Sequence, residues 1–126
     1  MSVKKWLATA GCLLALLAFS LVGCGGARSA NEVDMGVATF EQSSVTIKAG
    51  QAVHFVDPTT GGVHIICVGH GVQCAPQPDA PAELNTAQGR QFNQGETRDI
   101  VFPHTGTYTV VCIIHPGMQV VVTVTA

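Results

Sequence analysis

The sequence predicts an all-β protein, a Greek-key β-sandwich of about seven or eight short strands. Three observations favour this class. The chain has 126 residues, the length of a single domain. Beyond residue 32 it shows almost no helical period, and short runs rich in valine, isoleucine, threonine and phenylalanine alternate with turn residues. Hydrophobic residues make up 47% and charged residues only 11%, which indicates a packed domain preceded by an export segment.

The individual strands are expected where these runs occur. Alternation is clearest at Val53 and Phe55, which share one face of their strand. Residues 69–91 contain three prolines and are expected to be irregular, with one short helical turn near Ala82–Ala87. The strands predicted in chain order are Val37–Phe40 (weak), Ser44–Lys48, Ala52–Val56, Val63–Val68, Thr97–Phe102, Thr107–Cys112 and Gln119–Thr125.

The N-terminus has the layout of a secretory signal peptide. Lys4 and Lys5 precede the apolar run Trp6–Val22, and LVGC (21–24) follows. This ending resembles the lipobox of bacterial lipoproteins, in which cleavage leaves the cysteine as a lipid-bearing N-terminus. We therefore expect residues 1–23 to be removed and Cys24 to carry the lipid. An ordinary signal peptide or an uncleaved anchor helix are the alternatives.

These assignments predict a location outside the cytoplasm. Residues 24–31 are small and polar and read as a flexible tether, which leaves residues 32–126 as the domain. The protein would be lipid-anchored to a bacterial membrane, in the periplasm or at the cell surface. The 103 residues that remain after cleavage carry four basic and eight acidic side chains, a formal charge of −4. Such a chain has no basic patch for nucleic acid.

The cysteines divide into three groups. Of the five, Cys12 leaves with the signal and Cys24 takes the lipid. Cys67 and Cys74 flank the segment VGHGVQ, and we expect a structural disulfide between them, directly across an antiparallel pair. A second metal site formed with His70 is the alternative, because C-x2-H-x3-C has ligand-like spacing. Three cysteines in an oxidising compartment leave one without a partner, Cys112.

Cys112 opens the motif C-x2-H-x2-M, which continues through His115 to Met118 between two predicted strands. Thiolate and thioether favour Cu(I), and imidazole suits both oxidation states of copper. Two histidines and a cysteine in a plane, with a weak axial methionine, make the blue-copper electron-transfer set. The second histidine must come from elsewhere in the chain. His64 is the best candidate because it begins a strand after the Gly61-Gly62 turn.

At this point the chain resembles the cupredoxins, the family of plastocyanin, azurin and amicyanin. The strand GTYTVVC (106–112) is similar to the strand that leads to the family's cysteine, and the short ligand loop with Pro116 is similar to that of amicyanin. The resemblance extends from about residue 37 to 126. It implies one copper per chain that cycles between Cu(I) and Cu(II), with His64, Cys112 and His115 in the plane and Met118 as the axial ligand.

One departure from the family pattern concerns the residues next to the ligands. The family usually has asparagine directly after the first histidine, where its hydrogen bonds tie the two ligand loops together. Here Ile65 stands at that position, and Ile113 follows the cysteine. Because outer hydrogen bonds orient ligands and tune the metal, the redox potential and the spectral subtype are left open.

The site predicts an electron carrier and not an enzyme. The sequence shows no nucleophile–base motif, no carboxylate pair in motif context and no phosphate loop. The resemblance implies a monomer whose His115 edge passes electrons to redox proteins of an extracytoplasmic chain. A copper-delivery module and a fragment of a multidomain copper oxidase or nitrite reductase are the alternatives. His54 is expected to face solvent, and His70 and His104 to lie in turns.

Overall fold

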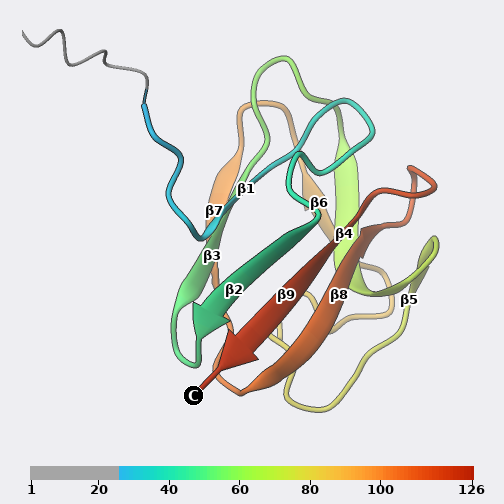
Figure 1. Cartoon of the computed structure of the whole chain (residues 1–126). Helices are drawn as coiled ribbons and strands as arrows, with labels where there is room; N and C mark the ends of the chain where they lie inside the picture. The colour runs from blue at the N-terminus through green and yellow to red at the C-terminus, as the bar shows by residue number, and fades with distance from the viewer. Residues whose placement is uncertain (1–25) are drawn as a thin grey trace, which may run out of the picture.

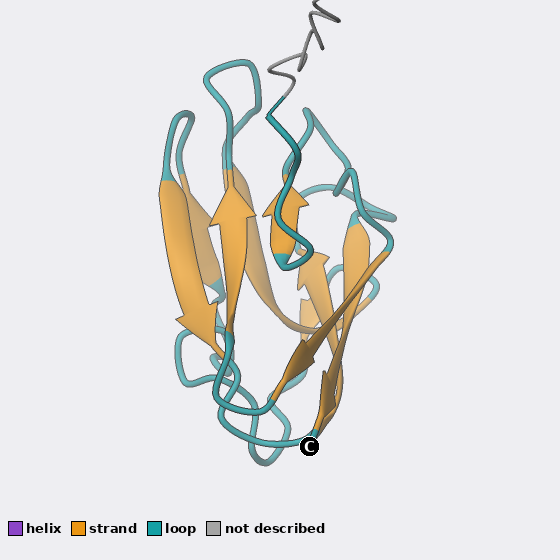
Figure 2. Cartoon of the chain, turned by 60° about the vertical axis from the view of Figure 1, so that its left-hand side comes forward, coloured by secondary structure: helices purple, strands orange, loops and turns teal. Residues whose placement is uncertain are grey.

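The computed structural model describes residues 26–126, and in this part of the chain every regular element is a strand (Figure 2). Among these residues no helix is long and apolar enough to cross a membrane. The predicted signal peptide and Cys24 lie outside the described residues. The strands are β1 (Glu32–Asp34), β2 (Ser44–Lys48), β3 (Ala52–Val56), β4 (His64–His70), β5 (Gln73–Cys74), β6 (Arg90–Phe92), β7 (Thr97–Val101), β8 (Gly106–Cys112) and β9 (Gln119–Thr125).

The strands form two sheets that pack face to face, which confirms the predicted β-sandwich (Figures 1 and 2). The smaller sheet has the order β1-β3-β7. The larger sheet has the order β2-β9-β8-β4-β5, and β6 also pairs with β4. β1 runs parallel to β3, and β2 runs parallel to β9, while the other pairs are antiparallel. The loops after β1, β3 and β8 lie toward the same end of the sandwich (Figure 1).

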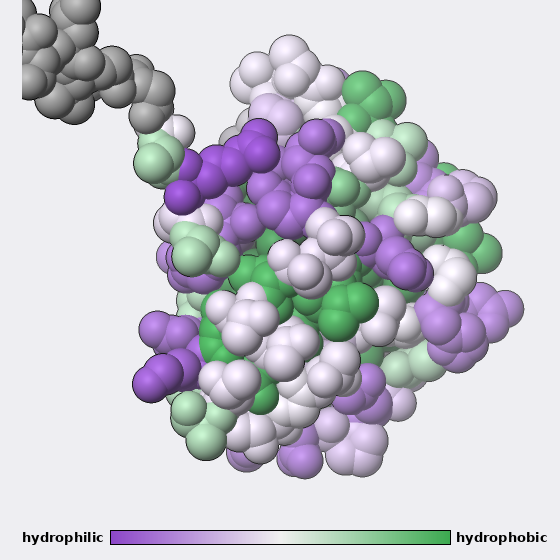
Figure 3. All heavy atoms as spheres, in the orientation of Figure 1, coloured by the Kyte–Doolittle hydropathy of each residue, from purple (hydrophilic) through white to green (hydrophobic). Residues whose placement is uncertain are grey.

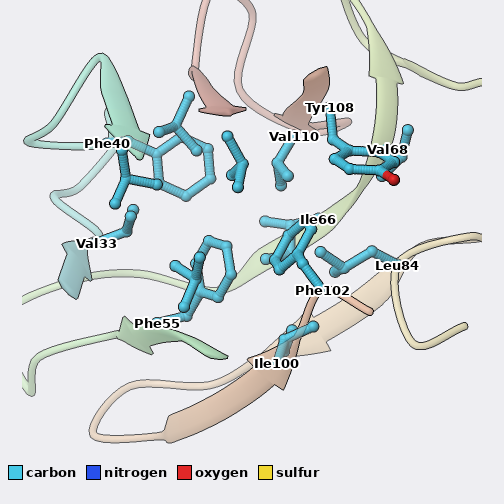
Figure 4. Close-up of a cluster of buried hydrophobic side chains, with 14 of the residues drawn as sticks. Val33, Phe40, Phe55, Ile66, Val68, Leu84, Ile100, Phe102, Tyr108 and Val110 are labelled. Atoms are coloured by element: carbon cyan, nitrogen blue, oxygen red, sulfur yellow. The ribbon is translucent and has the colours of Figure 1, made fainter. Parts of the chain in front are cut away.

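The core lies between the sheets because each strand turns alternate side chains inward. β2 and β3 have the burial pattern that the alternation predicts, with Val45, Ile47, Val53 and Phe55 buried. Figure 4 shows Phe55 and side chains of β7 facing those of β4 and β8 across the interior. Each fully buried aliphatic or aromatic side chain contributes roughly 1.5–3 kcal/mol. This packing holds the strand ends, and therefore the loops between them, in place.

Two details differ from the sequence-based expectation, and a third agrees with it. Val37–Phe40 is not a strand, and only an isolated bridge between Met35 and Phe40 marks this loop. Residues 26–126 form nine strands, more than expected, because β1, β5 and β6 have three residues or fewer and are too short to show an alternating pattern. The expected helical turn near Ala82–Ala87 is a single turn, in which the amide of Leu84 donates to the carbonyl of Pro81.

Cys67 and Cys74 form the predicted disulfide, with their Cα atoms 5.6 Å apart. The expected register was wrong, since Cys74 pairs with Gly69 and Cys67 pairs with Val111 of β8. The bridge therefore runs diagonally across the β4–β5 hairpin. Gly69 allows this close approach, because a Cβ at that position would collide with the backbone of Gln73. The disulfide rules out Cys67 and Cys74 as ligands of a second metal.

Candidate metal centre

The β8–β9 connection holds three of the four predicted ligands in one tight loop. Cys112 is the last residue of β8, and its amide donates to the carbonyl of Met118 at 3.0 Å. The amide of Met118 donates in turn to the carbonyl of His115 at 3.1 Å. Gly117 adopts a positive φ of 82°, which a residue with a Cβ rarely takes, so the turn suits glycine. These bonds bring the three side chains to the end of the sandwich.

His64 reaches the same place from the first residue of β4. β4 and β8 are antiparallel neighbours in which Ile66 pairs with Cys112. Beyond this pair, the amide of Ile113 donates to the carbonyl of Ile65 at 2.9 Å. This main-chain hydrogen bond ties the two ligand segments together. In the family pattern the side chain of an asparagine at the position of Ile65 has this role. Sequence reasoning could not find this bond, because any residue type supplies it.

Three of the predicted ligands, His64, Cys112 and His115, gather in one cluster. Sγ of Cys112 lies 3.5 Å from Nδ1 of His115 and 3.9 Å from Nδ1 of His64. The donor atoms of these three residues lie within 4.8 Å of one another. Ligands that bind one ion at about 2.0–2.3 Å are spaced in this way, so the donor set fits a single copper ion. Met118, with 1% of its surface exposed, supplies a thioether from the same loop.

Burial controls the charge of the histidine on β4. His64 is fully buried, and this burial lowers its pKa, with the neighbouring His115 acting in the same direction and the Gly36 carbonyl against it. The imidazole is therefore held neutral, which leaves a lone pair free to bind a metal. Cys112 is also fully buried and is the free cysteine among residues 26–126. His115 is only partly buried and gives the cluster its edge toward solvent.

Asp57 is a residue of this region that the sequence analysis did not single out. Its side chain is completely buried, and its pKa is raised to about 6 by burial and by the negative charge of Glu96. The amide of Gly62 favours the charged form, but neither carboxylate oxygen makes a hydrogen bond of ordinary length and angle. Oδ1 lies 4.0 Å from Nε2 of His64. The sequence signal that could have pointed to Asp57 is its position directly after the strand β3.

The remaining histidines stay away from the cluster. His70 and His104 are both exposed, but only His104 lies in a bend between strands as expected, whereas His70 is the last residue of β4. His54 faces solvent with part of its side chain, as expected, and its Nδ1 lies 2.5 Å from a carboxylate oxygen of Asp99. None of the three belongs to the group of potential metal ligands found among the described residues.

The surface around the cluster is partly apolar. Val37, Val63 and Ile114 are among the exposed large hydrophobic residues, and all three lie in the loops at this end. Gly61, in the turn before His64, does not belong to this surface because it is buried against Asp57. In Figure 3 apolar atoms also gather in the middle of the face that carries β2, β9 and β8, with polar residues around them.

A two-sheet sandwich with a His-Cys-His-Met cluster at one end defines a copper protein of the cupredoxin class. Residues 27–125 match the family of copper-binding proteins that includes plastocyanin and azurin, and the chain belongs to this family. It is similar in structure to amicyanin from Paracoccus versutus, with 22% identity over 75% of this chain and 79% of the other, at a TM-score of 0.53. A reduced Cu(I) amicyanin variant at pH 4 matches with 22% identity, 79% and 85% coverage and a TM-score of 0.56. At this level of identity the likeness shows a shared fold.

Proposed function

We propose that the protein is a blue-copper electron carrier that shuttles single electrons between redox proteins outside the cytoplasm. The observation that carries this proposal is the cluster of His64, Cys112 and His115, whose donor atoms lie within 4.8 Å of one another in a buried setting. Bound copper would supply one-electron chemistry by alternating between Cu(I) and Cu(II). The four protein ligands would leave no open position for a substrate, which favours transfer of electrons over catalysis.

The chain's own residues support the carrier role in two ways. The ligands come from strand ends and a hydrogen-bonded loop, which would favour a similar arrangement in both oxidation states. His115 is the partly exposed ligand, and Val63 and Ile114 give the surrounding surface an apolar character. Small and largely uncharged contacts suit the transient complexes that redox partners form. Partners would therefore dock at this end, with His115 as the point of electron entry and exit.

The visible spectrum and the voltammetry of the full-length protein test the proposal. The Cu(II)-loaded wild type should show an intense thiolate-to-copper band and a reversible one-electron couple. Cys112→Ser should remove the band, whereas Met118→Leu should keep the colour and shift the potential. A protein that binds only Cu(I) and shows no reversible couple would instead be a copper-delivery module.

The second part of the proposal concerns localisation, and it depends on the motif LVGC (21–24), which lies outside the described residues. Acylation of Cys24 would tether the domain to the outer side of a bacterial membrane. Native protein should fractionate with membranes, and Cys24→Ser should release it. An unmodified N-terminus elsewhere in the mature chain, detected by mass spectrometry, would make the protein a free exported carrier.

A further inference from the structure

Two buried polar groups beside the cluster face each other without a partner. Both oxygens of Asp57 and Nε2 of His64 lack a hydrogen bond, although both residues are completely buried. The gap between Oδ1 and Nε2 is 4.0 Å. A buried polar group without a hydrogen-bond partner destabilises the folded protein, and a charged one does so more strongly. Two such groups side by side point to a bond that forms in another state of the protein.

The surrounding loop is built to hold this carboxylate in place. The amide of Asp57 donates to the carbonyl of Glu96 at 2.8 Å. The carbonyl of Asp57 accepts from the amide of Gly95 at 2.8 Å. Gly61 closes the other side, where a Cβ would collide with Oδ1 of Asp57. The side chain of Gln94 fastens this turn by donating to the carbonyl of Gly61 at 3.0 Å. Two main-chain hydrogen bonds and the close approach of Gly61 thus set the position of Asp57, and neither hydrogen bond involves its carboxylate.

We propose that Asp57 is a positioning residue for the metal centre, which accepts a hydrogen bond from Nε2 of His64 when Nδ1 binds copper. This inference rests on the proposed copper function. Nδ1 of His64 is the nitrogen that faces Cys112, so a metal bound there leaves the ring proton on Nε2, the nitrogen nearest Asp57. To form a charge-assisted hydrogen bond, the two atoms would have to approach from 4.0 Å to ~2.8 Å.

The consequence concerns the metal that His64 holds. A carboxylate behind a ligating imidazole fixes its tautomer and orientation and raises its basicity. Such a partner strengthens the binding of divalent ions and favours Cu(II) over Cu(I), which lowers the reduction potential. The competing acceptor is the main-chain carbonyl of Gly36, which also lies near the ring. Of the two groups, only Asp57 can be changed by a side-chain substitution.

The first test compares Asp57→Asn with the matched control Asp99→Asn in the full-length protein. Asp99 is the carboxylate beside His54, a histidine outside the cluster. Competition titration with Zn²⁺ should show an affinity about 10- to 100-fold lower for Asp57→Asn, as the loss of an outer partner of a metal-bound histidine usually gives. Asp99→Asn should stay within about threefold of wild type. The copper reduction potential should rise in Asp57→Asn alone.

A second measurement separates positioning from simple structural support. Because Asp57 lacks a hydrogen bond in the metal-free protein, Asp57→Asn should leave the thermal stability of the metal-free form unchanged or raised. A variant that loses stability equally with and without Zn²⁺ would indicate a structural role and overturn the proposal. An unchanged Zn²⁺ affinity would also overturn it and leave the Gly36 carbonyl as the acceptor.

A third measurement uses the unmodified protein. The ¹³C resonance of the Asp57 carboxylate should move when Zn²⁺ is added, while that of Asp99 stays in place. An Asp57 resonance that does not respond to the metal would contradict the proposal. Zn²⁺ does not change its oxidation state, so these measurements test the role of Asp57 independently of electron transfer. A copper form without a reversible couple would contradict the proposed function but not the role of Asp57.

Discussion

The molecule contains two pairs of a histidine with an aspartate, and they lie in different surroundings. His54 and Asp99 face each other across β3 and β7 of the smaller sheet, with 36% and 69% of their side chains exposed and 2.5 Å between the nearest atoms. His64 and Asp57 lie at the loop end, fully buried and 4.0 Å apart. The exposed pair is within hydrogen-bond distance, while the buried pair is adjacent but not hydrogen-bonded.

The contrast shows that burial and neighbours, and not residue type, separate a functional histidine from a surface one. Water screens the pair on the smaller sheet, and such pairs contribute about 0–1 kcal/mol. The buried pair lies beside a thiol and a second imidazole, in a place where an unsatisfied polar group is expensive. Only in the buried pair would binding a metal relieve the cost of the unsatisfied groups.

Removing each histidine in turn should give the largest difference between the two regions. His64→Ala removes a ligand, so copper affinity should fall by more than the ~10- to 100-fold that changes behind a ligand cause, and the visible band should be lost. His54→Ala should keep both the colour and the affinity. Equilibrium copper titration followed by visible absorption measures the two variants side by side.

The control for this comparison is the stability of each variant without metal. His54→Ala should change the free energy of unfolding by at most about 1 kcal/mol, the upper end for an exposed pair of this kind. A His54→Ala protein that loses the visible band would show that the surface pair takes part in the metal centre, and it would remove the distinction drawn above.

Opening the disulfide tests whether the strand that carries His64 needs support. The double change Cys67→Ala and Cys74→Ala frees a short closed loop in the unfolded chain, and the free energy of unfolding should fall by about 2–3 kcal/mol. Urea unfolding of the metal-free protein measures this loss. The Zn²⁺ affinity should fall less than in His64→Ala, because the ligands themselves remain.

Two outcomes would contradict that prediction. Unchanged stability would mean that the β4–β5 hairpin is held by packing alone. A loss of metal binding as complete as in His64→Ala would mean that the bridge, three residues from His64, belongs to the metal centre.

The smallest effect is expected at Glu96, which connects the two regions. Its carboxylate accepts a hydrogen bond from Arg98 at 2.8 Å, and its carbonyl accepts from the amide of Asp57. The bond from Arg98 holds the pKa of Glu96 below its usual value, so its contribution to stability is present above that value and is lost as the pH falls through the native pKa. Glu96→Gln should therefore destabilise the protein by at most about 1 kcal/mol at pH 7.

The pH dependence of this effect is its check. The difference between wild type and Glu96→Gln in chemical denaturation should shrink as the pH falls below the ordinary glutamate pKa of about 4.3 and vanish once it has passed the lower native pKa. Glu83→Gln is the matched control, because Glu83 lies farther from Arg98, at 3.9 Å, and is more exposed. A difference that persists unchanged at low pH would assign the effect to packing.

Local patterns carried much of the prediction. β2 and β3 were predicted because inward residues such as Val45 and Phe55 recur every second position. The loop from Cys112 to Met118 was predicted because a tight turn between two strands must bring its side chains to one end. β1 and β6 were missed because three residues show no period, and the Cys67–Cys74 register was wrong because Gly69 lets the strands approach more closely than an ordinary pair.

By itself, the sequence determined the sandwich, the odd cysteine and the ligand types, since each depends on residues near one another in the chain. The tertiary structure decided how distant segments meet. It brought the carbonyl of Ile65 to the amide of Ile113, and it placed the carboxylate of Asp57 behind His64. No spacing in the chain encodes these contacts, because they arise from the packing of separate strands and loops. The role of a carboxylate such as that of Asp57 is set by its burial and by the groups packed around it.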